Sequence, residues 1–162
     1  MFSKEFIAFS EKLLEAYRDA GLRIVTAESC TGGLIAALLT EIAGSSDVVE
    51  RGFVTYSNEA KMECLGVAEE TLRAHGAVSA ETAAAMALGA LAQSRADVAL
   101  SVTGIAGPGG GSPAKPVGLV WFGLARRGGC RTARHVFTGD RGAVRRAAVE
   151  TGLSLLAEEL TA

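Results

Sequence analysis

A serine and a lysine are the residues of this sequence that could form a catalytic pair. Ser29 stands in the Gly-rich turn Ser29-Cys30-Thr31-Gly32-Gly33, directly after a predicted strand, and Lys61 follows Tyr56 by five residues. A serine hydroxyl becomes a nucleophile when a base takes its proton, and a lysine is such a base when its amine is neutral. A helix starting near Asn58 would place Tyr56, Asn58 and Lys61 within reach of one site.

Composition leaves the identity of the base open. The chain has four lysines, of which Lys4 and Lys12 belong to the solvated face of the first predicted helix. Lys61 could equally be an exposed side chain paired with a neighbouring glutamate, and Lys115 could be a loop lysine that closes over an anion. A catalytic lysine needs burial or nearby positive charge, because its ordinary pKa is about 10.4.

Other nucleophiles and bases are less convincing. His75 is expected at a helix end and His135 on a strand face, so a Ser–His–Asp triad is disfavoured. Cys30 is next to Ser29, but its side chain should point elsewhere and act as a small buried thiol.

Two Gly-rich turns each follow a predicted strand, the first at Ser29–Gly33 and the second at Gly104–Gly111. In α/β sheets, ligands bind beyond the carboxyl ends of strands. A helix beginning near Gly32 would direct unpaired N–H groups at an anion or oxyanion there. These glycines could also simply close tight turns. Neither turn is a P-loop or opens a helix with GxGxxG, so kinase and Rossmann functions are disfavoured.

Charge argues against a nucleic-acid binder but indicates one basic region. The 162 residues carry a formal net charge of −2, whereas such binders usually have a strong basic excess. Seven of the twelve arginines fall between Arg126 and Arg146. Arg141 and Arg145 are four residues apart at the start of the last predicted helix and could grip one phosphate. The alternative is a solvated basic helix face.

The sequence favours a cytoplasmic protein. No apolar run approaches the ~20 residues that span a bilayer, and the acidic N-terminus is unlike a signal peptide. Three cysteines without CxxC spacing argue against a disulfide framework or a zinc site. We therefore expect no membrane contact, no metal and no cofactor.

Hydrophobic periodicity predicts one α/β domain over residues 1–162. Helices and strands alternate along most of the chain, and a hairpin near its end makes the sheet mixed. The small residues of the Ala-rich helix suggest that it lies close against the sheet. The predicted helices cover 2–17, 33–44, 58–65, 69–75, 79–94 and a terminal stripe at 149–160, and the predicted strands cover 23–26, 48–56, 97–103, 117–125 and 131–137.

Five separated motifs resemble the CinA C-terminal domain family over nearly the whole chain. They lie at 27–33, 51–61, 103–108, 115–118 and 139–145. The resemblance implies a three-layer α/β/α sandwich around a mixed β-sheet. It also implies an amidohydrolase that converts nicotinamide mononucleotide and water to nicotinate mononucleotide and ammonia, in pyridine-nucleotide salvage. Many family members carry an additional N-terminal domain, which we do not expect here.

The resemblance assigns roles to individual residues. Ser29 corresponds to the family's nucleophile, Lys61 to its base, and Tyr56 to a tyrosine that assists proton transfer or orients the lysine. Backbone N–H groups of Thr31, Gly32 and Gly33, or of Thr103 and Gly104, would stabilise the oxyanion. Arg141 and Arg145 are the candidates for holding the phosphate, and Asn58 is a further candidate for substrate binding.

Three alternatives remain at this point. The pocket could belong to a nucleotide sensor without turnover, or to an amidase for another small carboxamide. The first helix and the Ala-rich helix could instead serve assembly, including a homo-oligomer.

Overall fold

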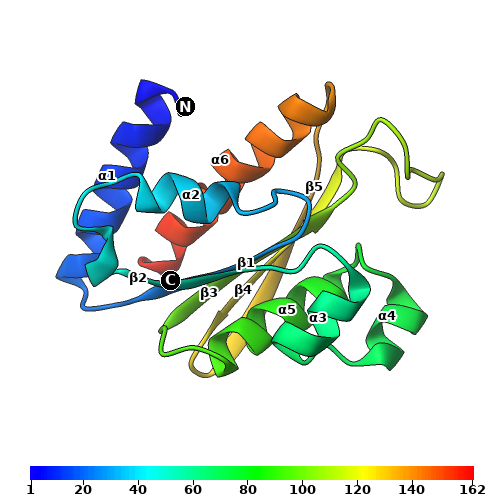
Figure 1. Ribbon diagram of the computed structural model, residues 1–162, viewed down its shortest axis with the longest axis horizontal. Coiled ribbons are helices and arrows are strands. Elements are labelled where there is room, and N and C mark those ends of the chain that lie inside the picture. The colour runs from blue at the N-terminus through cyan, green and yellow to red at the C-terminus, as the bar shows by residue number, and fades with distance from the viewer.

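The computed structural model describes residues 1–162 and contains five strands and six α-helices, confirming the predicted α/β class. Three helices cover each face of the sheet, so the molecule is a three-layer sandwich (Figure 1). In chain order the elements are α1 (Lys4–Asp19), β1 (Ile24–Glu28), α2 (Leu34–Thr40), the 3₁₀ turn η1 (Ser45–Asp47), β2 (Val49–Val54), α3 (Asn58–Leu65), α4 (Glu69–His75), α5 (Ala80–Ala92), β3 (Val98–Gly104), β4 (Leu119–Arg126), β5 (Gly129–Val136) and α6 (Arg141–Glu159).

Each face of the sheet has its own hydrophobic core. Helices α1, α2 and α6 pack on one face around a cluster of 22 buried residues that includes Ile24 and Leu100. Helices α3, α4 and α5 cover the other face around a cluster of 10 buried residues that includes Val25 and Met86. The central strands β1 and β3 are therefore buried on both faces, and their sequences do not alternate apolar and polar residues.

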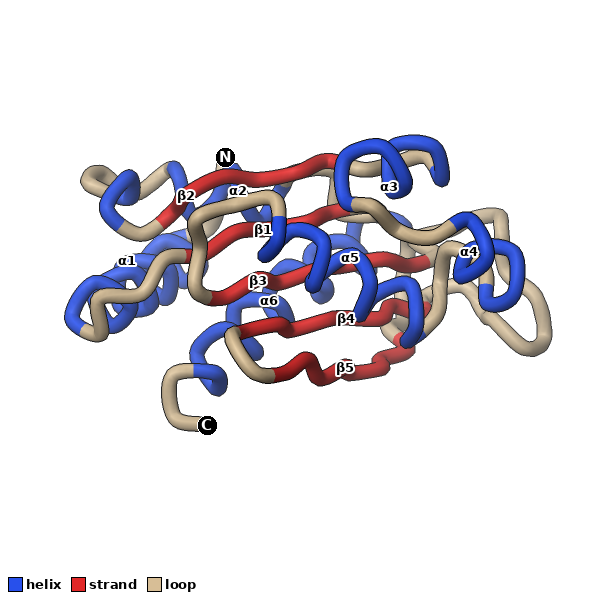
Figure 2. Tube along the Cα trace, turned by 90° about the horizontal axis from the view of Figure 1, so that it is seen from below, coloured by secondary structure: helices blue, strands red, loops and turns tan.

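The sheet has the strand order β2-β1-β3-β4-β5 (Figure 2). Strand β1 runs parallel to β2 and β3, whereas β4 is antiparallel to β3 and β5 is antiparallel to β4. Glu28, the last residue of β1, pairs with Val54 of β2 and Val102 of β3. Because the three parallel strands end at one edge, the segments that follow them emerge side by side.

The Ala-rich helix α5 lies close against the sheet, as predicted. Its N-cap is Ser79, whose hydroxyl accepts a hydrogen bond from the Thr82 N–H at 3.1 Å. A Cβ on Gly123 of β4 would collide with the carbonyl group of Ala83 in α5. The small residues at this contact therefore allow α5 and β4 to pack closely against each other.

Several predicted boundaries differ from the structure by a few residues, and three of the differences have a clear description. The helix predicted over 33–44 ends at Thr40 and is followed by η1, and β2 ends at Val54 rather than at residue 56. Strand β5 begins at Gly129, two residues earlier than predicted, because Arg126 pairs with Gly129 across a two-residue turn. Gly128 in that turn has φ +97°, which glycine adopts at little cost.

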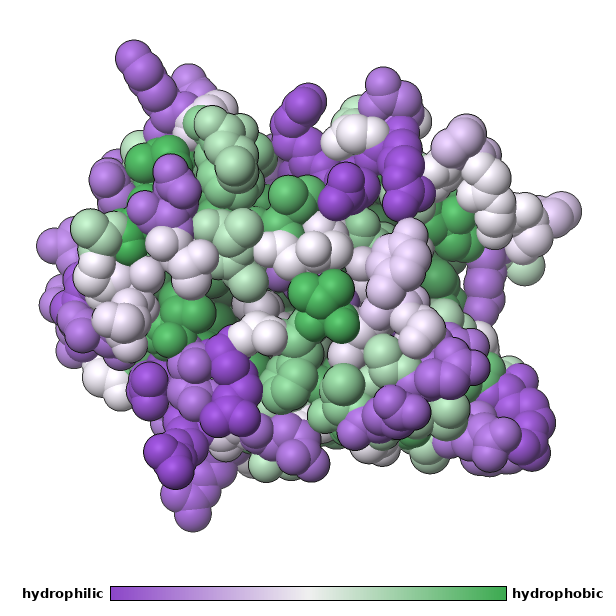
Figure 3. All heavy atoms as spheres, viewed as in Figure 1, coloured by the Kyte–Doolittle hydropathy of each residue, from purple (hydrophilic) through white to green (hydrophobic).

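Exposed apolar side chains are distributed over several elements. The largest are Met1, Phe9, Val54, Tyr56, Leu88 and Val136. Figure 3 shows apolar residues interspersed with hydrophilic ones on the face that it displays. None of the helices combines the length and hydropathy needed to cross a membrane.

Candidate active site

The alternation of side chains along β1 decides where Ser29 points. Successive residues of a strand face opposite sides of the sheet. Ile24 belongs to the core beside α1, α2 and α6, whereas Val25 and Ala27 belong to the core beside α5. Ser29 follows Ala27 by two residues and therefore faces the same side as Val25 and Ala27. Its N–H donates to the Val102 carbonyl at 2.9 Å, so the pairing with β3 continues to this residue. Its hydroxyl consequently faces the α3 layer.

Helix α3 delivers Lys61 to that hydroxyl. Ser57 caps the helix by accepting a hydrogen bond from the Ala60 N–H at 3.0 Å. Lys61 and Leu65, four residues apart, are the two buried residues of α3 and share the face that meets the sheet. Lys61 is only 1% exposed. The alternative of an exposed lysine paired with a glutamate is therefore wrong.

The surroundings of Lys61 suit a neutral amine. Its Nζ lies 3.0 Å from Ser29 Oγ and donates to the carbonyl oxygens of Thr55 at 2.7 Å and Tyr56 at 3.4 Å. None of the ion pairs in the structure involves this lysine. Burial lowers the pKa of Lys61 because it disfavours the charged form. When the amine is neutral, its two N–H donors match the two carbonyl oxygens, and its lone pair is then left for the Ser29 hydroxyl.

A cavity of about 170 Å³ opens over this pair. Its wall combines the ends of β1 and β3 with the segment before α5 and the start of α6. The lining residues are Ser29, Cys30, Tyr56, Lys61, Ala77, Val78, Thr103, Gly104, Ala106 and Arg141. Small-molecule sites usually measure about 300–1,000 Å³, so this cavity holds only the reacting end of a larger ligand.

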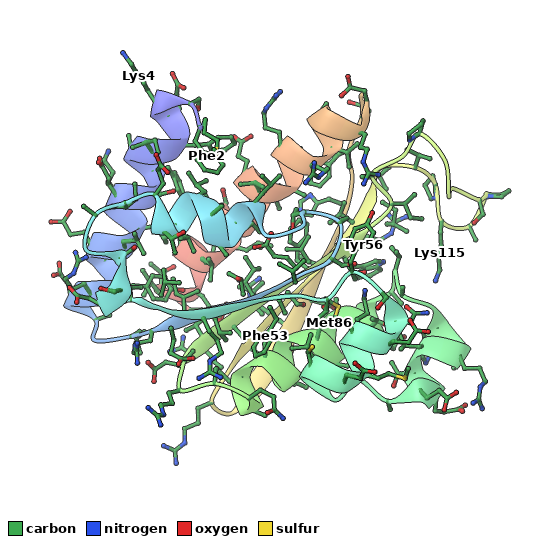
Figure 4. All side chains as sticks on the ribbon, in the orientation of Figure 1. Phe2, Lys4, Phe53, Tyr56, Met86 and Lys115 are labelled. Atoms are coloured by element: carbon green, nitrogen blue, oxygen red, sulfur yellow. The ribbon has the colours of Figure 1, made fainter.

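Tyr56 and Arg141 form the rim of the cavity. The Arg141 guanidinium donates to the Tyr56 hydroxyl at 3.2 Å and to the Gly107 carbonyl at 2.9 Å. Tyr56 is 63% exposed, and Figure 4 shows it at the same end of the sheet as Lys115. Lys115 donates to the His75 carbonyl at 2.5 Å and borders a neighbouring hollow instead of this cavity.

Two of the three N–H groups expected to be free in the first Gly-rich turn, those of Gly32 and Gly33, have partners within the protein. The Gly32 N–H donates to the Ser29 carbonyl at 3.0 Å. The Gly33 N–H donates to the carboxylate of Glu28 at 3.2 Å, and so do the N–H groups of Ile35 at 3.1 Å and Ala36 at 2.8 Å. A buried carboxylate thus occupies the start of α2. The cavity is lined by Thr103 and Gly104 at the end of β3, and not by Thr31, Gly32 or Gly33.

Arg141 and Arg145 do not share one cavity. The Arg145 guanidinium donates to the carbonyls of Cys30 at 3.1 Å and Thr31 at 3.2 Å, and it does not line the cavity over Ser29. One turn of α6 separates the two residues, yet their side chains reach different segments. Only Arg141 is placed to meet a ligand bound beside Ser29.

The remaining predicted site residues lie around the pair rather than in it. Thr103 lines the cavity, and its hydroxyl donates to the Ala77 carbonyl at 2.7 Å. Thr31 is fully buried beneath the turn, and Asn58 lies exposed on the first turn of α3. Burial raises the pKa of the Cys30 thiol to about 11, which fits an inert buried cysteine.

Sequence reasoning did not assign a role to Glu28 or to the walls Ala77, Val78 and Ala106. Glu28 carried a signal, since it lies between a predicted strand and a predicted buried helix, and an acid that is buried there needs partners. The small apolar wall residues carry no chemical signal, because only the fold brings them to Ser29.

The fold and the site together define a mixed-sheet α/β protein with a buried serine–lysine pair at the carboxyl ends of its parallel strands. The model of the CinA C-terminal domain matches residues 7–160, so the chain belongs to the CinA C-terminal domain family.

Named relatives and solved structures agree with this membership. The chain is 54% identical to the nicotinamide-nucleotide amidohydrolase PncC of Escherichia coli K12, over 96% of this chain and 95% of that protein. It is 52% identical to a putative competence-damage inducible protein of Caldicellulosiruptor bescii, over 93% of this chain and 36% of that longer protein. The crystal structure of the competence/damage inducible protein CihA from Agrobacterium tumefaciens superposes with a TM-score of 0.93 at 50% identity, covering 100% of this chain and 99% of that one.

Proposed function

We propose that this protein hydrolyses the carboxamide of nicotinamide mononucleotide to nicotinate mononucleotide and ammonia, with Ser29 as nucleophile and Lys61 as base. The observation that carries the proposal is the 3.0 Å separation of Lys61 Nζ and Ser29 Oγ, two buried residues that line one cavity. The name of the E. coli relative supports the choice of substrate.

The first half of the reaction forms an acyl-enzyme. Neutral Lys61 takes the proton of Ser29 while Oγ attacks the carboxamide carbon, which becomes tetrahedral and negatively charged on oxygen. We assign the oxyanion to the backbone at Thr103 and Gly104, which line the cavity, because Gly32 and Gly33 donate elsewhere and Thr31 does not line the cavity. The C–N bond then breaks, and the Lys61 ammonium returns its proton to the leaving nitrogen, which departs as ammonia.

The second half of the reaction releases the acid. Water enters the space that ammonia has left, gives a proton to Lys61 and attacks the acyl carbon. The ester bond breaks, and Ser29 recovers its proton from Lys61. The positive charge of the pyridinium helps keep Lys61 neutral before each proton transfer, since like charges disfavour protonation.

The size of the cavity directs the rest of the substrate toward Arg141. About 170 Å³ accommodates the pyridine carboxamide, and the ribose and phosphate then extend past the rim. Arg141 is the guanidinium on that rim, and charge-assisted bonds from arginine suit a phosphate. Arg145 would act on the substrate indirectly, through the turn that carries Ser29.

The reaction belongs to pyridine-nucleotide salvage in this proposal. The three cysteines are all free, which fits the reducing cytoplasm in which such nucleotides are recycled.

The test incubates the purified protein with nicotinamide mononucleotide and follows nicotinate mononucleotide and ammonia by mass spectrometry. We expect product from the wild type and none from Ser29→Ala, and an acid quench should trap the acyl group on the peptide that contains Ser29. Tight binding without product would favour a sensor. Product from another carboxamide alone would favour a different amidase.

A further inference from the structure

The carboxylate of Glu28 is completely buried and has only backbone partners. One oxygen accepts from the N–H of Ala36 at 2.8 Å, and the other accepts from Gly33 at 3.2 Å and Ile35 at 3.1 Å. No lysine or arginine forms an ion pair with it. A buried charge is costly unless hydrogen bonds compensate it, so this arrangement needs an explanation.

Ordinary helix capping does not provide that explanation. The N-cap residue of α2 is Gly33, which has φ +95° and no side chain to accept a hydrogen bond. Most caps come from the Ser, Thr, Asp or Asn at the N-cap itself. Here the acceptor comes from the strand residue that precedes Ser29, five positions before Gly33. Glu28 therefore ties the end of β1 to the start of α2 and closes the turn between them.

Strand alternation couples Glu28 to the nucleophile. Glu28 faces the α2 layer and Ser29 faces Lys61 on the opposite side, because neighbouring side chains of a strand point to opposite faces. A rotation of the backbone that took Glu28 from its three N–H partners would turn Ser29 away from Lys61. In the same turn, the Arg145 guanidinium donates hydrogen bonds to the carbonyl oxygens of Cys30 and Thr31.

We infer that Glu28 is a positioning residue, which holds the Ser29 hydroxyl at hydrogen-bonding distance from Lys61 by fixing the turn from its far side. This inference rests on the proposed function, in which Ser29 is the nucleophile. Glu28 touches neither the cavity nor the reacting atoms, so its effect on turnover must pass through the backbone.

The test compares Glu28→Gln with Leu14→Ala, a variant of a buried α1 residue that is 1% exposed and remote from the cavity. Glutamine keeps the size of the side chain, but its NH₂ group would face an N–H donor. We expect kcat of Glu28→Gln to fall about 10–100-fold with KM little changed, because small misplacements of reacting groups cost about that much. Leu14→Ala loses stability without this loss of kcat. Equal kcat in both variants would overturn the inference.

A second measurement separates this inference from the proposed substrate. A fluorophosphonate probe reacts with an activated serine whatever the natural substrate is, and mass spectrometry locates its adduct. We expect Glu28→Gln to label Ser29 about 10–100-fold more slowly than Leu14→Ala does. If wild-type Ser29 is labelled but nicotinamide mononucleotide is not hydrolysed, the proposed substrate is wrong. The labelling rates of Glu28→Gln and Leu14→Ala then still test the role of Glu28. No labelling of wild-type Ser29 would overturn the nucleophile and the inference together.

If Glu28→Gln does not fold, Glu28→Asp takes its place. Aspartate keeps the charge, but its side chain is one methylene shorter and cannot reach all three N–H groups. A folded Glu28→Asp should show the same selective loss of kcat and of labelling, to a smaller degree. Wild-type rates in that variant would overturn the inference.

Discussion

Lys61 Nζ lies 3.0 Å from Ser29 Oγ, although 32 residues separate the two along the chain. The two groups exchange one proton in the proposed mechanism and so act as a unit. Removing either side chain should therefore abolish most of the rate enhancement that the pair provides, because the effects of residues that act together on catalysis are far from additive.

The double variant tests this unit. Ser29→Ala and Lys61→Met should each lower kcat by at least about 10³-fold. The double variant should be no slower than the slower single variant, as measured by ammonia release. A double variant whose loss equals the product of the single losses would show that the two residues act independently.

The pH dependence of kcat/KM should report the titration of Lys61. Burial lowers the pKa of this lysine from its ordinary 10.5, and only the neutral amine can accept the Ser29 proton. Activity should therefore be lost as pH falls through the lowered pKa and should be recovered above it. Rates measured with nicotinamide mononucleotide from acid to alkaline pH give this limb. An acid limb centred at 10.5 or above would contradict a lysine depressed by burial.

Stability should also depend on pH through Lys61. The unfolded chain binds a proton on this lysine up to its ordinary pKa, whereas the folded chain releases that proton at a lower pH. Between the two pKa values the unfolded state holds more protons, so stability rises with pH. Urea unfolding at several pH values should show wild type gaining stability relative to Lys61→Met as pH rises. Lys12→Met, an exposed control, should follow wild type.

Arg141 should contribute through the phosphate of the substrate. Arg141→Met should raise KM for nicotinamide mononucleotide about 10–100-fold, the range for a lost hydrogen bond to a charged group. It should change KM for nicotinamide riboside, which lacks the phosphate, much less. Arg146→Met, an exposed neighbour outside the cavity, is the matched control. The same loss with both substrates would place the phosphate elsewhere.

Gly123→Ala should weaken the contact between α5 and the sheet. Its Cβ would meet the backbone carbonyl of Ala83, which also accepts the Ser101 hydroxyl at 2.6 Å. Overpacking of this kind costs about 1–3 kcal/mol in free energy of unfolding. Gly129→Ala, in the partner strand, would meet nothing within 4 Å. Thermal unfolding of the two variants gives the comparison, and equal midpoints would refute the tight contact.

The secondary structure was largely predictable because it depends on local patterns. The Ser79 cap, the Ala-rich helix and the two helices before it have short-range signals in the sequence. The end of α2 was predicted less well, since no glycine or proline follows Leu34–Thr40 until Gly44.

The nucleophile and its base were nominated from sequence, but their surroundings were not. Ser29 and Lys61 were candidates by residue type, by their place after predicted strands and by resemblance. Whether Lys61 was buried or solvated could not be read locally, because α3 carries glutamates beside it that an exposed lysine could have paired with. Of the N–H groups expected to be free at the first Gly-rich turn, that of Gly33 donates to Glu28 and that of Gly32 donates to the Ser29 carbonyl.

By itself the sequence determined the elements, the Gly-rich turns and the residue types able to do chemistry, because these depend on neighbours a few positions apart. Only the tertiary structure decided that Lys61 loses its water beside Ser29, that Arg141 faces the cavity, and that Arg145 faces the turn. Desolvation and direction depend on packing between distant segments. That packing is set by the register of three parallel strands that end at one edge of the sheet.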